Sequence, residues 1–140
     1  MNISFYLLPK SEVAYVHEED NVGQALRTIR KKGFQAVPVI DKDGKYRGTV
    51  TEGDFLWALT CDYHNDLDTM KKTSVRSLRK RWDYHAVSIE ANIAELNEYI
   101  VNQNYVPVVD SRDIFIGIIT RKAIITELLK ETEQLENKGE

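Results

Sequence analysis

Short apolar runs alternate with amphipathic stretches along the chain, and this pattern predicts two successive units of the same kind. Ala36–Ile40 is short, continuous and apolar, as in a buried strand. Just before it, Val22, Ala25 and Ile29 recur at helical spacing. We therefore expect a first unit of strand, helix, strand, strand and helix. Its elements are expected near residues 13–16, from Asp20 or Asn21 to Gly33, and at 36–40, 45–51 and 53–60.

The second half of the chain follows the same order of elements. We expect strands at residues 85–88, 106–110 and 114–120, a helix at 92–102, and a long final helix from Lys122 to about Glu136. This last helix carries Ile125, Leu128 and Leu129, an apolar stripe that outlasts its counterpart in the first unit. We therefore expect the stripe to pair two chains in a homodimer.

The two units also repeat each other in sequence. Ala36-Val37-Pro38-Val39-Ile40-Asp41 returns as Tyr105-Val106-Pro107-Val108-Val109-Asp110, and the same constant offset relates Thr51 to Thr120. In the helices before these strands, where Ile29 corresponds to Ile100, the offset is larger by two, which places a two-residue deletion in the second copy. Repeated units of this size must stack to bury their apolar faces, and a cleft between two halves is a common ligand site.

The length of the chain is that of a single domain, which must contain both copies. Its 140 residues are too few for two independent domains, since each copy of about 60 residues buries a marginal core. We expect an α+β fold in which two tandem β-α-β-β-α repeats pack with pseudo-two-fold symmetry. We assign residues 1–60 to the first repeat, 61–74 to a linker, 75–136 to the second repeat and 137–140 to a tail.

Composition narrows the function classes. With a net charge of −3 the chain has no overall positive charge that would attract nucleic acid. No apolar run approaches the length of a membrane span. The one cysteine, Cys61, fits a reducing compartment, so we expect a cytoplasmic protein. Three scattered histidines lack metal-ligand spacing, and no nucleophile–base pair emerges, so we predict no metal site, no cofactor and no enzyme.

Basic residues gather around the linker, and they leave two interpretations open. They are a solvated surface, which is the common case, or a patch for phosphate or an acidic partner. The cluster comprises Lys71, Lys72, Arg76, Arg79, Lys80 and Arg81.

The best local candidate for a ligand site is the stretch from Gly48 to Asp54. It runs from the end of a strand into a helix, where free backbone N–H groups attract anions. The Thr51 hydroxyl can donate to a phosphate, and Asp54 can accept hydrogen bonds from two ribose hydroxyls. The alternative is structural: Thr51 caps the helix and Asp54 completes a capping box.

These motifs resemble a pair of cystathionine-β-synthase (CBS) domains, a Bateman module. The resemblance rests on the strand with Val-Pro-Val, on Asp41 and Asp110 entering the hairpin turns, and on Gly-apolar-apolar-Thr before a helix. It covers the chain from Tyr6 to about Leu129. The resemblance implies a regulatory, non-catalytic module whose clefts bind an adenosyl ligand such as AMP, ADP, ATP, S-adenosylmethionine or a cyclic dinucleotide.

The family's ligand residues map unevenly onto the two copies. In the first copy, Thr51 and Asp54 match the phosphate and ribose contacts, and the backbone of Ala36, Val37 and Pro38 matches the adenine contact. The second copy supplies Tyr105 and Val106 at the strand and Thr120 at its end, but Ala123 replaces the aspartate. Phe34 and Tyr105 flank the two strands and are candidates for base contact.

Cations follow Thr120 in the second copy. A cation at a helix N-terminus opposes the helix dipole, and a bound anion facing Arg121 and Lys122 would resolve the conflict. Thr-Arg-Lys is similar to the Thr-Arg-Arg of small stand-alone CBS pairs that bind cyclic di-AMP. We expect a module that binds AMP, ATP or cyclic di-AMP and signals to an unknown effector protein. The alternative is a ligand-free structural or interaction module.

Overall fold

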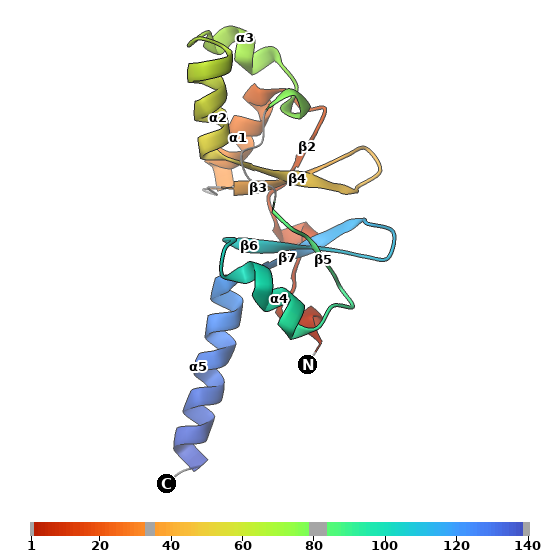
Figure 1. Ribbon diagram of the computed structural model, residues 1–140, viewed down its shortest axis with the longest axis vertical. Helices are drawn as coiled ribbons and strands as arrows, with labels where there is room; N and C mark the ends of the chain where they lie inside the picture. Colours follow the sequence, from red (N-terminus) through yellow and green to blue (C-terminus); the bar gives the residue numbers. More distant parts are fainter. Residues whose placement is uncertain (1, 33–35, 79–83, 139–140) are drawn as a thin grey trace.

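The structure is a computed structural model that describes residues 2–32, 36–78 and 84–138. Two small sheets lie one above the other, and helices cover their outer sides (Figure 1). The first half contains β1 (Leu8–Pro9), β2 (Val16–His17), α1 (Val22–Lys32), β3 (Ala36–Ile40), β4 (Tyr46–Thr51), α2 (Glu52–Trp57) and α3 (Leu67–Lys72). The second half contains β5 (Val87–Ser88), α4 (Ile93–Ile100), β6 (Tyr105–Val109), β7 (Phe115–Thr120) and α5 (Arg121–Lys138).

Local sequence explains where the helices begin. Asn21 accepts a hydrogen bond from the Gln24 N–H, and the Gln24 side chain accepts one from the Asn21 N–H. Asn92 likewise accepts from the Glu95 N–H at the start of α4. These bonds satisfy N–H groups that a helix start leaves without partners. Gly33, the expected end of α1, lies outside the described residues.

The two hairpins are close copies of each other. Strand β3 pairs antiparallel with β4, and β6 pairs with β7 in the corresponding register, so that Val37 faces Val50 where Val106 faces Ile119. Both pairings shift at corresponding points, just after Val39 and just after Val108. At both turns an aspartate, Asp41 or Asp110, accepts two backbone N–H bonds. The predicted α+β fold with two β-α-β-β-α repeats is confirmed.

The sheets differ at one edge, where the N-terminal segment crosses to the second repeat. The first repeat has the order β2-β3-β4, whereas the other sheet has the order β1-β7-β6-β5. Strand β1 pairs antiparallel with β7, which places Pro9 opposite Gly117. Ile3 is fully buried among residues of the second repeat. The beginning of the chain, which the sequence assigned to the first repeat, therefore packs on the second.

The segment between the repeats is more ordered than a linker. It forms α3, whose Met70 is buried in the core of the first repeat together with Val75 and Leu78. Of the basic cluster, Lys71 and Lys72 are exposed, and Arg76 forms an ion pair of 3.3 Å with Glu19. Arg79, Lys80 and Arg81 lie outside the described residues.

A third apolar cluster joins the two repeats. Its buried members come from both sheets, namely Val13, Ala36, Ile40, Tyr105, Phe115 and Ile118. A chain of hydroxyl hydrogen bonds crosses the same interface, from Tyr46 to Thr49 at 2.7 Å and from Thr49 to Tyr105 at 2.8 Å. Apolar burial of this kind is the main stabilising term in folding, so the pair behaves as one unit rather than two.

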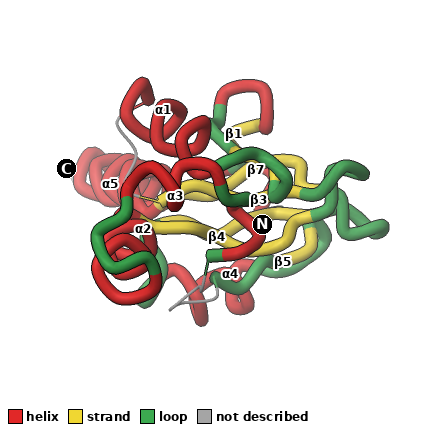
Figure 2. Tube along the Cα trace, turned by 90° about the horizontal axis from the view of Figure 1, so that it is seen from above, coloured by secondary structure: helices red, strands yellow, loops and turns green. Residues whose placement is uncertain are grey.

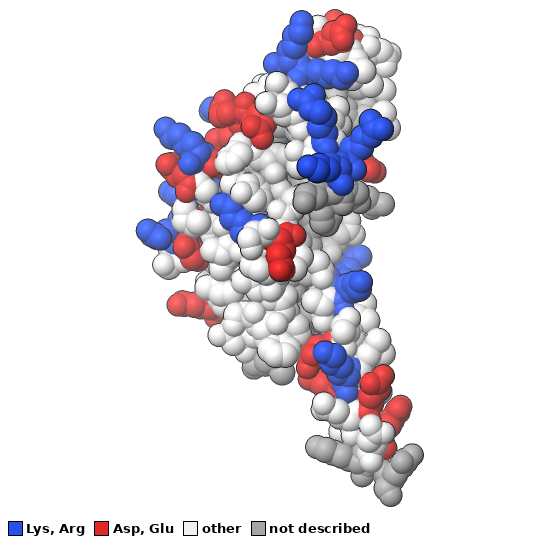
Figure 3. Space-filling model, turned by 180° about the vertical axis from the view of Figure 1, so that it is seen from behind, with Lys and Arg blue, Asp and Glu red and all other residues white. Residues whose placement is uncertain are grey.

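Helix α5 leaves the body of the molecule and projects outward (Figures 1 and 3). Its side chains Ile125, Leu128 and Leu129 are 54%, 56% and 59% exposed. The apolar stripe expected from the sequence is thus present on the surface. Among the described residues, no helix combines the length and the apolar character needed to cross a bilayer.

Candidate ligand pocket between the repeats

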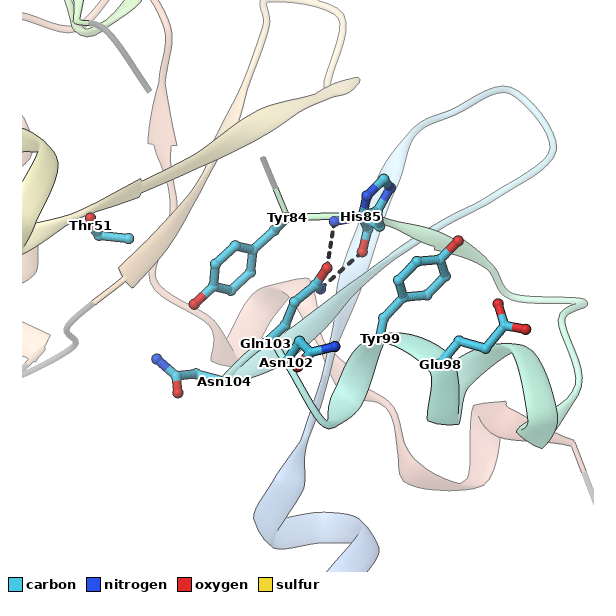
Figure 4. A pocket seen from close by; sticks show the side chains of 8 residues that line it. All are labelled: Thr51, Tyr84, His85, Glu98, Tyr99, Asn102, Gln103 and Asn104. Carbon is cyan, nitrogen blue, oxygen red and sulfur yellow. Dashed lines mark hydrogen bonds between the residues drawn. The ribbon is translucent and has the colours of Figure 1, made fainter. Parts of the chain in front are cut away.

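A pocket opens where the end of β4 in the first repeat faces the second repeat (Figure 4). Its volume of about 700 Å³ is in the range of small-molecule sites. The first repeat contributes Thr51. The second repeat contributes residues before β5, on α4 and in the connection from α4 to β6, namely Tyr84, His85, Glu98, Tyr99, Asn102, Gln103 and Asn104.

One buried amide holds the wall of this pocket in place. Gln103 is 6% exposed, and its Oε1 accepts a 2.7 Å hydrogen bond from the His85 N–H. Its Nε2 donates to the carbonyl oxygens of His85 and Tyr105, at 3.1 and 3.2 Å. The His85 ring stacks on Tyr99 with a centroid distance of 4.8 Å. The wall is therefore fixed by bonds within the second repeat before any ligand binds.

Thr51 and Asp54 form the capping box of α2. The Thr51 hydroxyl oxygen accepts a 3.2 Å bond from the Asp54 N–H, and Asp54 Oδ2 accepts a 2.9 Å bond from the Thr51 N–H. Thr51 lines the pocket, whereas Asp54 is 1% exposed and does not. The structural alternative for this pair is thus present in the fold. A ribose contact by Asp54 stays a prediction, and it requires the carboxylate to turn outward.

The strand residues expected at the adenine are all buried. Ala36 is 7% exposed, Val37 and Val106 are 0% exposed, and none of the three lines the pocket, so their expected contact with the adenine stays a prediction. Pro38 is also buried, opposite Thr49 in β4. Phe34, the other base-contact candidate, lies outside the described residues.

Tyr105 does not line the pocket, and its expected base contact stays a prediction. It is 6% exposed, and its ring lies 5.0 Å from that of Tyr84. Burial is the largest of the influences on its pKa and raises it well above the usual value for tyrosine, so the hydroxyl stays neutral and bonds to Thr49. Tyr84, which is less buried, lines the pocket, as do the rings of His85 and Tyr99.

Arg121 also has a structural partner. Its Nε donates to the Ile100 carbonyl at 2.8 Å, and its guanidinium NH2 group donates to the Val101 carbonyl at 2.9 Å. These are carbonyls that the end of α4 leaves without helical partners. A cation at the start of α5 is therefore explained without an anion. Thr120 caps α5 through a 3.1 Å bond from the Ala123 N–H, and Lys122 is exposed.

Sequence reasoning missed most of the pocket lining. Glu98, His85 and the run Asn102–Asn104 were not among the expected site residues. The signal in the sequence that could have pointed to this run is the two-residue deletion, which makes the connection before β6 shorter than its counterpart in the first repeat. Among the described residues, no group of three or more His, Cys, Asp or Glu side chains could hold a metal ion.

Comparison with known proteins places the fold in a family. The sequence model of the CBS domain matches residues 6–60 and again residues 75–130. The chain belongs to the CBS-domain family. As a CBS pair it is similar to Cyclic di-AMP receptor B of Bacillus subtilis, with 22% identity over 130 residues that cover 93% of this chain and 88% of that protein. A CBS domain-containing protein of Dictyostelium discoideum is 26% identical over 116 residues, covering 78% of this chain and 79% of that protein.

Solved structures share the arrangement of this CBS pair. The crystal structure of CbpB in complex with c-di-AMP matches with a TM-score of 0.86 and 24% identity, over 99% of this chain and 91% of that one. CBSX2 in complex with AMP matches with a TM-score of 0.73 and 23% identity, over 94% and 98%. At this level of identity the likeness establishes the fold.

Proposed function

We propose that this CBS pair is a non-catalytic regulatory module that binds an adenine nucleotide between its repeats. The observation that carries the proposal is the pocket of about 700 Å³ beside Thr51, which both repeats build. Similar CBS proteins support the ligand class, since one is named a cyclic di-AMP receptor and others were crystallised with c-di-AMP or AMP.

Within the pocket, each end of the ligand has suitable groups. In the proposed complex the Thr51 hydroxyl contacts the phosphate. The backbone of Ala36–Pro38, which is buried and does not line the pocket, is the contact with the base that the family resemblance implies. Tyr84 offers a ring for stacking, and the amide of Asn104 offers donors and acceptors for the adenine edge. Asp54 turns from its capping bond to the ribose when ligand is present.

The corresponding end of the second repeat is the other part of the proposed site. Thr120 and Lys122 lie at the start of α5, next to the strand that contains Val106. Arg121 anchors α4 to this point through its two carbonyl bonds. Phosphate at this end is expected to contact Lys122 and the Thr120 hydroxyl.

We further propose that the module works as a homodimer in the cytoplasm and reports ligand occupancy to an effector protein. The exposed stripe on α5, and Leu56 and Trp57 on α2, which are 63% and 40% exposed, supply an apolar surface. A ligand can change the signal only by binding two arrangements of the module with different affinity. Sedimentation at micromolar concentration should show a dimer; a single 16.2 kDa species would contradict it.

A ligand-free interaction module is the second candidate, and one observation favours it. Asp54 and Arg121, two residues expected at the ligand, both have structural bonds that account for their presence. Under this alternative, the exposed apolar stripe would be the functional surface and the pocket would remain empty in use.

Thermal unfolding in the presence of nucleotides separates the two candidates. Adenosine, AMP, ADP, ATP and cyclic di-AMP are tested on the purified chain, with GMP and cyclic di-GMP as matched controls. A ligand at 100 times its dissociation constant should add about 2.7 kcal/mol to the free energy of unfolding. An increase with adenine compounds and none with the guanine controls supports the proposal. No increase with any adenine compound supports the ligand-free module.

A further inference from the structure

A single peptide group in the pocket wall is held from both repeats. It joins Tyr84 to His85, and both of these residues line the pocket. Its N–H, which belongs to His85, donates to Gln103 Oε1 of the same repeat at 2.7 Å (Figure 4). Its carbonyl oxygen, which belongs to Tyr84, accepts a 3.2 Å hydrogen bond from the Tyr46 hydroxyl of the first repeat. We call these two hydrogen bonds the peptide clamp, since each repeat holds one side of the same peptide group.

The Tyr46 hydroxyl is the last member of a directional chain of hydrogen bonds. A carbonyl oxygen only accepts, so the hydrogen of the Tyr46 hydroxyl points to Tyr84. Because a hydroxyl has one hydrogen, Thr49 donates to Tyr46 at 2.7 Å, and Tyr105 donates to Thr49 at 2.8 Å. Hydrogen bonds in such a chain polarise one another and become stronger. The chain thus begins in the buried interface between the repeats and ends in the pocket wall.

Further contacts hold Tyr46 against the second repeat. Its N–H donates to the Asp113 carbonyl at 3.3 Å, and the Phe115 N–H donates to the Gly44 carbonyl at 2.9 Å. Its ring stacks on that of Phe115, with an angle of 29° between the ring planes. The turns of both hairpins lie at the same end of the stacked sheets, which allows these contacts (Figure 2). The Tyr46 hydroxyl therefore approaches Tyr84 from a position that the packing of the two repeats fixes.

We propose that Tyr46 is a positioning residue that couples ligand binding in the pocket to the packing of the two repeats. Its bond to the Tyr84 carbonyl sets the place of the Tyr84 backbone, and with it the ring that lines the pocket. A ligand that needs this wall binds best when the repeats are packed in this way, and by linkage the bound ligand favours the same packing. This inference rests on the proposed function, and it adds the residue through which a ligand acts on the interface.

Two substitutions that each remove one hydroxyl of the chain separate positioning from stability. Tyr46→Phe keeps the ring that stacks on Phe115 and removes the bond to Tyr84. Thr49→Val removes the middle of the chain and keeps the bond from Tyr46 to Tyr84. Both should lower the melting temperature, because each leaves a buried hydroxyl without its acceptor. Both are expected to keep the fold, since the apolar part of each side chain retains its shape.

Tyr15→Phe is the matched control for the loss of a tyrosine hydroxyl. Tyr15 packs against the same apolar cluster, and its ring lies 6.2 Å from that of Phe115. Within residues 2–32, 36–78 and 84–138, no hydrogen bond of its hydroxyl is found. Tyr15→Phe should therefore bind ligand and unfold as the wild type does.

Calorimetry with AMP and with cyclic di-AMP measures the coupling. For the ligand that the wild type binds more tightly, Tyr46→Phe should weaken binding about fivefold, the effect of one lost neutral hydrogen bond. Thr49→Val and Tyr15→Phe should stay within about twofold of the wild type, because both keep the peptide clamp. A merely structural hydroxyl would lower the melting temperature in Tyr46→Phe as in Thr49→Val and leave the affinity of both variants unchanged.

Hydrogen exchange of the His85 amide tests the peptide clamp without any ligand. This N–H belongs to the peptide group whose carbonyl Tyr46 holds. In Tyr46→Phe it should exchange about fivefold faster relative to the amides of β6, which report the stability of the whole fold. In Thr49→Val the ratio of the two exchange rates should stay that of the wild type.

The outcomes separate this inference from the function on which it rests. If neither nucleotide binds the wild type, the proposed function fails and the coupling fails with it. If a nucleotide binds and Tyr46→Phe loses no more affinity than Thr49→Val, the positioning role is overturned while the proposed function stands. An unchanged relative exchange rate of the His85 amide in Tyr46→Phe would overturn the peptide clamp. Weaker binding together with faster exchange in Tyr46→Phe alone supports the inference.

Discussion

The two repeats share their backbone far more closely than their chemistry. Their hairpins pair in the same register, shift at corresponding points and turn on an aspartate in the same way. Beyond the hairpins they differ. In the first repeat a capping box closes the start of α2, whereas in the second an arginine at the start of α5 bonds to the end of α4. The comparison teaches that the hairpins define the fold and that the helix starts are where function is expected to differ.

The largest difference between the repeats is the strand β1, which is added to the second sheet. Gly117→Ala should disrupt the pairing of β1 with β7. A Cβ at residue 117 would clash with the Leu8 carbonyl oxygen and with Leu7 Cδ1, and this glycine has a φ of +159°. Because the nearest atom belongs to the backbone, β1 must shift. We expect a loss of about 2–3 kcal/mol in the free energy of unfolding, measured by urea denaturation.

Gly53→Ala in the first repeat is the matched control for this substitution. A Cβ at Gly53 would meet its nearest neighbour, Thr51 Oγ1, at 3.6 Å, which is ordinary contact. Alanine also favours the helical conformation, so stability should stay the same or rise by up to about 1 kcal/mol. An equal loss in both variants would show that β1 does not depend on Gly117.

The second effect concerns the capping box that only the first repeat has. Asp54→Ala removes a buried acceptor of the Thr51 N–H and should cost about 1–2 kcal/mol of unfolding free energy. Ala123→Asp, which copies the box into the second repeat, should gain about 0.3–1 kcal/mol because an acid enters the first turn of α5. Chemical denaturation measures the free energy of unfolding of both variants, Asp54→Ala and Ala123→Asp. A neutral Asp54→Ala would mean that the box contributes nothing to stability.

The third effect separates the two cations at the start of α5. Arg121→Ala removes two hydrogen bonds to the end of α4 and should cost about 0.5–1 kcal/mol, a modest value because the side chain is exposed. Lys122→Ala should be neutral or slightly stabilising, since a cation there opposes the dipole. Thermal unfolding without ligand compares them directly. Equal effects of the two substitutions would remove the structural role from Arg121.

The smallest effects should be the same in both repeats. Backbone N–H bonds, foremost that of Lys45 for Asp41 and that of Arg112 for Asp110, lower the pKa of both aspartates below the usual 3.8. Since the pKa is lower in the folded state, each carboxylate stabilises the fold above pH 3.8, and the effect is lost as the pH falls below that value.

Asp41→Asn and Asp110→Asn should each make stability less dependent on pH in the acid range. Urea denaturation between about pH 5 and pH 2 gives the slopes. The two variants should lose the same share of the acid dependence. A flattening in one variant alone would show that the two turns are not equivalent in the way that their hydrogen bonds indicate.

Local pattern predicted the hairpins and the helix starts because their causes lie within a few residues. The Val-Pro-Val strands and the caps at Asn21, Thr51 and Asn92 need only their neighbours. The pairing of β1 with β7 was not predicted, because a two-residue strand is too short to show an alternation of apolar and polar residues. The helix α3 in the linker was not predicted either, because contacts with α1 hold it in place.

The candidate site was predicted less completely because its contacts join distant parts of the chain. Thr51 was found from its motif, and it lines the pocket. The Tyr105 hydroxyl bonds to Thr49, and Arg121 bonds to the end of α4. In both cases the partner is far away in sequence. Glu98 carries no motif at all. Its place in the pocket follows only from how the repeats stack.

A crystal structure of the protein with AMP tests the central claim most directly, namely that the CBS pair binds an adenine nucleotide in the pocket between its repeats. We predict electron density for base and ribose between Thr51 and Asn104, with the Tyr84 ring beside the base. AMP bound elsewhere on the chain, or an empty pocket in crystals grown at a nucleotide concentration that saturates binding in solution, would contradict the account.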